Sequence, residues 1–85
     1  MKTETRVKFR LSQPINQDDF ERLMLFFFKK EITEIIPKEN NQGVIIVEHW
    51  SPSDLAAILC RIALLCAQML IEQGHSKVGD AFVIL

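Results

Sequence analysis

Residues Val44–Gln73 read VIIVEHWSPSDLAAILCRIALLCAQMLIEQ and join an apolar strand to a long capped helix. Ser51 is the predicted N-cap, Pro52 takes the first helical position, and an acid three residues after the cap completes a capping box. The helix that follows is apolar over roughly three quarters of its circumference. Its polar residues, Asp54, Arg61, Gln68 and Glu72, fall within one narrow arc. A helix that rests on a core needs an apolar stripe only a little over ~100° wide, so we expect part of this surface to meet a partner.

The same order of signals occurs in the first half of the chain. Thr5–Leu11 alternates between outer polar and inner apolar side chains, which is the period of a half-buried strand. Asn16 is a second N-cap signal, and a helix is predicted from Gln17 to Glu31. The core face predicted for this helix consists of Phe20, Leu23, Met24, Phe27 and Phe28.

Three shorter segments complete the pattern. Ile32–Ile36 and Val44–Trp50 are predicted strands joined by the turn Pro37–Gly43, and Ala81–Leu85 is a short final strand. The order β-α-β-β-α-β predicts an α+β, ferredoxin-like fold with both helices on one face of a four-stranded antiparallel sheet. The pattern does not distinguish a last strand that pairs within the chain from one swapped with a second copy.

Length and composition limit the classes of protein. The 85 residues are expected to form one domain, residues 1–85, and the formal net charge of −1 supplies no general attraction to nucleic acid or to an anionic membrane. Cys60 and Cys66 lie about 240° apart on one helix and cannot form a disulfide within it. Free thiols and an N-terminus without a secretory signal predict a cytoplasmic protein. Arg61, near the middle of the long helix, argues against a membrane span.

The predicted fold class includes RNA-binding domains, and one segment bears on that function. Gln42–His49 resembles a degenerate form of the third-strand signature of the RNA recognition motif, in which Gly43 and Val47 match by type and spacing. The positions of the base-stacking aromatic residues hold Val44 and Ile46. Stacking contributes ~1–3 kcal/mol per base, so the pattern argues against nucleic acid as the partner.

A basic ladder, Arg6, Lys8 and Arg10, is predicted on one face of the sheet. These side chains could contact an anion or a nucleic acid, or they could form a solvated face that pairs with Glu48 on the next strand. A nucleic-acid-binding domain that uses this ladder is the first alternative to the hypothesis below. A small-ligand sensor with its site between associated sheets is the second.

The sequence contains no motif for catalysis, a cofactor or a metal ion. It has no nucleophile elbow, no phosphate-binding glycine loop and no H-E-x-x-H. The spacing of His49, Cys60, Cys66 and His75 matches no zinc pattern. We therefore expect a non-enzymatic protein with no cofactor and no catalytic or metal-binding residues.

Apolar helix surface provides the leading hypothesis. Leu25 and Phe26 lie off the predicted core face of the first helix, and the second helix has a wider apolar arc than one core can cover. We expect a small adaptor-type or inhibitor-type interaction module that self-associates as a homodimer, with a different protein as the other candidate partner. The predicted interface residues are Leu25, Phe26, Leu59, Ala63, Cys66 and Leu70.

Overall fold

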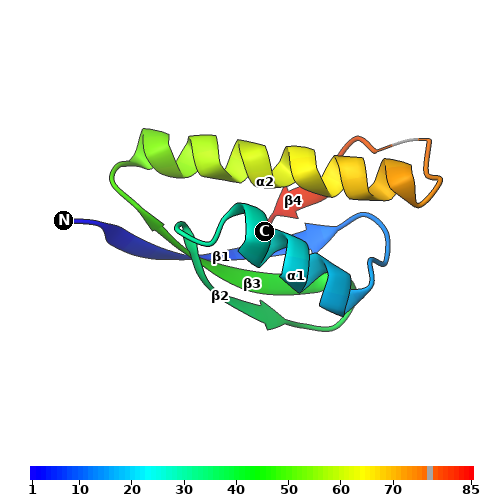
Figure 1. Cartoon of the computed structure of the whole chain (residues 1–85), viewed down its shortest axis with the longest axis horizontal. Helices are drawn as coiled ribbons and strands as arrows, with labels where there is room; N and C mark the ends of the chain where they lie inside the picture. The colour runs from blue at the N-terminus through cyan, green and yellow to red at the C-terminus, as the bar shows by residue number, and fades with distance from the viewer. Residues whose placement is uncertain (77) are drawn as a thin grey trace.

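The chain folds into two helices and a four-stranded antiparallel sheet (Figure 1), as seen in a computed structural model that describes residues 1–76 and 78–85. The elements are β1 (Thr3–Leu11), α1 (Gln17–Phe27), β2 (Ile32–Pro37), β3 (Gln42–His49), α2 (Pro52–Glu72) and β4 (Phe82–Ile84). The predicted α+β class is confirmed. The last strand pairs with β1 of its own chain, so it is not swapped in this structure.

The sheet has the strand order β2-β3-β1-β4, and each neighbouring pair is antiparallel. Because side chains alternate along a strand, β1 directs Val7, Phe9 and Leu11 into the core under the helices. Its even-numbered residues point to the other face. The strand β4 covers only the end of β1, where Phe9 pairs with Ile84 and Leu11 with Phe82.

Phe9 lies at the centre of the core. Its ring stacks on the ring of Phe20 from α1 at a centroid distance of 5.7 Å and on that of Phe82 from β4 at 5.1 Å. Gly43 faces Phe9 across the sheet, and a Cβ at this position would lie 2.7 Å from the Phe9 ring. The glycine is therefore required by a close approach and not by its backbone angles.

The first helix is shorter than predicted and ends at Phe27, not at Glu31. Phe28 is the C-cap, with φ −124°, and its backbone N–H donates to the carbonyl of Met24. The N–H of Ile32 then donates to the carbonyl of Phe28, which closes a tight turn into β2. This turn puts Phe28 in the core and leaves Phe27 exposed, so the prediction of Phe27 as a core residue was wrong.

Both predicted N-caps are confirmed. The side-chain oxygen of Asn16 accepts a hydrogen bond from the Asp19 N–H at 3.0 Å, and Ser51 Oγ accepts one from the Asp54 N–H at 3.1 Å. The Asp54 carboxylate also accepts a hydrogen bond from the Trp50 N–H at 2.8 Å. Each helix start is thus held by a local contact that its own sequence supplies.

We expect Ser51→Ala to lower the free energy of unfolding by about 0.5–2 kcal/mol, because an N–H of the first turn loses its acceptor. Asn16→Ala should have an effect of similar size. Urea unfolding followed by circular dichroism measures both changes. Ser76→Ala, a change at an exposed serine after α2, is the control. Equal midpoints for the wild type and both cap variants would contradict the assigned helix starts.

Candidate functional site

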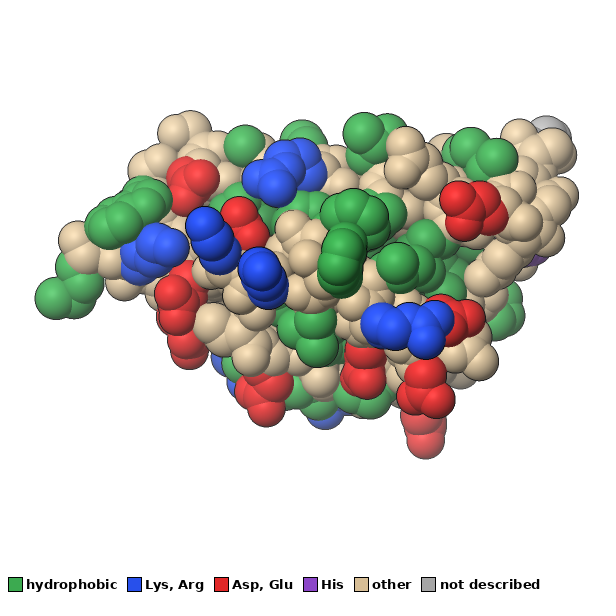
Figure 2. Space-filling view, in the orientation of Figure 1, with side chains coloured by type: hydrophobic (Ala, Val, Ile, Leu, Met, Phe, Trp, Pro, Cys, Tyr) green, Lys and Arg blue, Asp and Glu red, His purple; other side chains and the backbone are tan. Residues whose placement is uncertain are grey.

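Large apolar side chains are exposed where the end of α1 lies beside α2. Phe26, Phe27 and Leu64 are 71 %, 53 % and 62 % exposed, and we refer to these three residues as the helix-layer patch. The rings of Phe26 and Phe27 meet edge to face at a centroid distance of 5.1 Å. Figure 2 shows hydrophobic side chains gathered over this part of the helix layer, between flanking charged groups. Clustered exposed apolar surface of this kind is typical of an interaction site.

A shallow hollow of about 230 Å³ lies beside the patch and extends it between the helices. Phe27 and Leu64 contribute to its walls, together with Leu65 and the charged side chain of Arg61. The Arg61 guanidinium lies 5.1 Å from the centroid of the Phe28 ring, and its Nη1 is 4.0 Å from Glu31 Oε1. An apolar floor with a charged rim can receive an apolar side chain of a partner and still hold polar contacts at its edge.

The structure separates the predicted interface residues instead of bringing them into one surface. Phe26 belongs to the helix-layer patch. Leu25 is also exposed, but it lies about 200° from Phe27 around the helix axis and so on another flank of α1. Leu59 and Ala63 line a groove of about 460 Å³ between α2 and β4.

The remaining two predicted interface residues, Cys66 and Leu70, are fully buried. They continue a four-residue series with Ile58 and Ile62, the stripe of α2 that packs on the sheet. Burial raises the pKa of the Cys66 thiol to about 12, which keeps the thiol protonated and unreactive at neutral pH. Neither residue can contact a partner while the domain is folded. Because α2 is apolar on so many sides, its sequence alone did not indicate which stripe faces the sheet.

Sequence reasoning missed Phe27 and Leu64. No local signal marks Phe27 as exposed, because a helix that continued to Glu31 would keep it on the core face. Leu64 could have been found, since it lies about 60° from Arg61 around the helix axis, at the border of the polar arc of α2.

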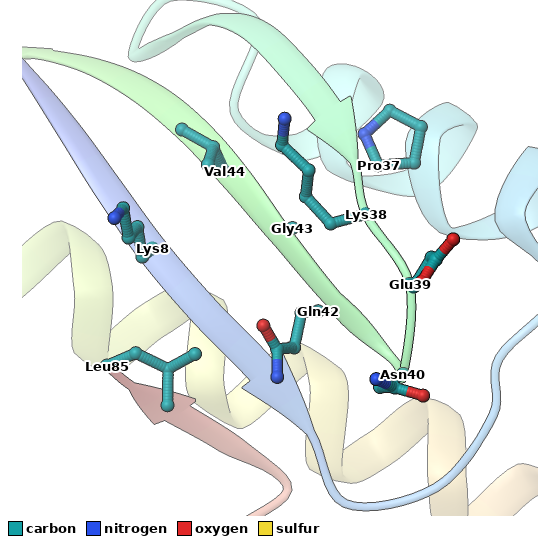
Figure 3. A pocket seen from close by; sticks show the side chains of 9 residues that line it. All are labelled: Lys8, Pro37, Lys38, Glu39, Asn40, Gln42, Gly43, Val44 and Leu85. Carbon is teal, nitrogen blue, oxygen red and sulfur yellow. The ribbon is translucent and has the colours of Figure 1, made fainter.

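The open face of the sheet carries the predicted basic ladder, and Arg6, Lys8 and Arg10 are all exposed there. Of these three residues, Lys8 alone lines the hollow of about 760 Å³ on this face. It lies across the sheet from Lys38, which also lines the hollow (Figure 3). A carboxylate, Glu39, lines the same hollow. The hollow therefore combines two lysine side chains with one carboxylate.

The apolar residues of β3 on the open face are not available to a partner. Val44 is 3 % exposed and Ile46 is 8 % exposed, although both helices lie on the other side of the sheet. Their cross-strand neighbours on β1 are Lys8 and Arg6. The long stems of such side chains can cover apolar surface while their charged ends stay in water.

The buried histidine has a structural role. The Nε2 atom of His49 is 2.6 Å from Thr5 Oγ1, and its Nδ1 is 3.0 Å from the carbonyl oxygen of Ser51. These contacts tie the end of β3 to β1 and to the start of α2. Over residues 1–76 and 78–85, no three His, Cys, Asp or Glu side chains are grouped so that they could hold a metal ion.

Comparison with protein-family models, with curated proteins and with solved structures found no match for the chain. Within the described residues, α2 is long and apolar enough to cross a membrane. One stripe of α2 packs on the sheet, but only 28 % of the apolar 18-residue stretch that meets this criterion is buried.

Proposed function

We propose that this protein is a small, non-enzymatic protein–protein interaction module with a ferredoxin-like βαββαβ fold, and that it self-associates through its apolar helix surface. The strand order supports the fold assignment, because β3 lies between β1 and β2 while β1 lies between β3 and β4. Two interleaved split βαβ units produce this arrangement.

The observation that carries the proposal is the helix-layer patch. Phe26 and Phe27 are adjacent, exposed and in mutual contact, and neither contributes to the core cluster. Aromatic side chains bury large apolar areas at interfaces and are enriched among the residues that dominate binding energy. The apolar hollow next to the patch offers a receiving surface of matching chemistry.

A second copy of the chain carries both the exposed aromatic side chains and the apolar hollow that can receive them. In a two-fold dimer the same surface is used on both subunits, so the Phe26 of each protomer would face the hollow of its partner. The charged rim at Arg61 would remain at the edge, where polar groups keep contact with water. This arrangement covers the patch without requiring any change in the fold.

We expect Phe26→Glu to weaken self-association by at least about tenfold, because a charge would be placed in a desolvated contact. Leu25→Glu is the matched control, since Leu25 is an exposed apolar residue on another flank of the same helix. Sedimentation equilibrium of the wild type and both variants measures the dissociation constants. Equal weakening by the two substitutions, or none by either, would contradict the patch as the contact surface.

A further inference from the structure

The edge of β1 that faces β4 is only partly paired. The Leu85 N–H donates to the Lys8 carbonyl at 2.9 Å, and the Ser12 N–H donates to the Ala81 carbonyl at 3.2 Å. Lys8 in β1 and Ser12 just after it therefore direct their backbone groups toward β4, and both have even residue numbers. Strand geometry then directs the backbone groups of Glu4 and Arg6 to the same side. In the described part of the chain no strand pairs with this side of residues 3–7.

We infer that a second copy of the chain pairs with this free edge, antiparallel to β1 and centred on Thr5, so that the two sheets become one. Exposed strand edges are templates for pairing with another chain. The inference goes beyond the proposed function, because it concerns a different surface from the helix-layer patch and a different kind of contact.

The length of the free edge determines the centre of the pairing. β1 begins at Thr3, and the backbone of Leu85 occupies the edge from Lys8 onward. The free segment thus runs from Thr3 to Val7, and its midpoint is Thr5. An antiparallel copy centred on Thr5 places Thr3 opposite Val7 of the partner and fills the segment on both chains.

Charge selects the same register independently. Centring on Thr5 places Glu4 opposite Arg6 of the partner and Arg6 opposite Glu4 of the partner, and opposite charges directly across strands are favourable. Centring on Glu4 or on Arg6 would place like charges against each other. Shifting the register by one residue would place even-numbered residues of one strand opposite odd-numbered residues of the other. The backbone groups of such residues do not point toward each other.

The charges on this edge have no partners within the described part of the protomer. Glu4 is paired across the sheet with Glu48, which is a like-charge neighbour, and neither Glu4 nor Arg6 forms a salt bridge there. A second copy would bring an arginine beside each Glu4. The pairing therefore relieves an unfavourable arrangement that the isolated chain retains.

A groove between α2 and β4 lies on this side of the domain. The helix contributes Leu59 and the small side chains of Ala56, Cys60 and Ala63 to it. Small side chains at a contact permit a short distance between helix axes. The helix-layer patch lies between α1 and α2, away from this edge, so edge pairing leaves it uncovered.

Charge exchange tests the inference directly. We expect Glu4→Arg alone and Arg6→Glu alone each to weaken the dimer by about tenfold or more, because two-fold symmetry repeats every mismatch. The double variant Glu4→Arg/Arg6→Glu should return the dissociation constant to within about threefold of the wild type, since it restores opposite charges across the strands. Arg10→Glu is the matched control, because Arg10 lies on the same face but pairs with Val83 of β4.

A disulfide test reports the register. In the proposed pairing the two Thr5 residues form a non-hydrogen-bonded pair with Cα atoms about 4.5 Å apart, within the range for a disulfide of about 4.4–6.8 Å. Thr5→Cys in a Cys60→Ala background should form a covalent dimer on mild oxidation. Thr3→Cys in the same background is the control, because the two Thr3 residues would lie too far apart.

Sedimentation equilibrium of the charge variants separates this inference from the helix-layer proposal. Weakening by both single changes with recovery in the double variant supports edge pairing. A dimer that Phe26→Glu abolishes and that the charge variants leave unchanged overturns edge pairing while it supports the helix-layer contact. A wild type that stays monomeric at about 100 μM overturns edge pairing, because a stable interface is saturated at that concentration. Equal crosslinking of the Thr5→Cys and Thr3→Cys variants also overturns it.

Discussion

Replacing Phe9 with alanine should lower the free energy of unfolding by about 3–5 kcal/mol, which is the range for loss of a buried aromatic side chain. The Phe9 ring stacks on those of Phe20 and Phe82, so its loss opens a cavity shared by β1, α1 and β4. A chain of 85 residues has a total stability of about 4–13 kcal/mol. The variant should therefore lose a large part of that stability.

Phe26→Ala is the matched control for this prediction. The same ring is removed, but from an exposed position, and the free energy of unfolding should change by no more than about 0.5 kcal/mol. Urea unfolding at a low protein concentration, where self-association does not contribute, measures both variants. A similar loss for Phe9→Ala and Phe26→Ala would contradict the assignment of one ring to the core and the other to the surface.

Leu70→Ala should cost about 2–5 kcal/mol of unfolding free energy, because it removes a fully buried side chain from the stripe of α2 that packs on the sheet. Leu64→Ala makes the same change on the same helix at an exposed position. It should leave the free energy of unfolding within about 0.5 kcal/mol of the wild type.

The pair of leucine variants also separates stability from association. Leu64 belongs to the helix-layer patch, so Leu64→Ala should weaken self-association while it leaves thermal unfolding of the monomer unchanged. Leu70→Ala should lower the thermal midpoint of the monomer. The reverse result, with Leu70→Ala affecting association alone, would place Leu70 at an interface and would contradict the packing of α2 described here.

Local signals predicted much of the fold because they act through neighbouring residues. The Asn16 and Ser51 caps depend on hydrogen bonds across three residues, and both were confirmed. The alternation along Thr5–Leu11 correctly predicted which side of β1 faces the core, because successive side chains of a strand point to opposite faces. The α+β class followed from the order of these segments.

The candidate site was predicted less well, because it depends on where a helix ends and how it rotates. The turn at Phe28 exposes Phe27, and this turn is held by a contact between Ile32 and Phe28 rather than by a cap signal. The apolar arc of α2 could have faced the sheet in several orientations. Packing selected the stripe that contains Cys66 and Leu70, which moved both from the predicted interface into the core.

The sequence by itself determined the strands, the helix starts and the excess of apolar helix surface, because periodicity and capping act over a few residues. Only the tertiary structure decided which apolar residues remain exposed and which part of the β1 edge has no partner strand among the described residues. There β4 pairs with Phe9–Leu11 and not with Thr3–Val7, and this depends on the pairing of segments that are far apart in the chain. Such pairing is set by long-range packing and loop geometry, which no local pattern records.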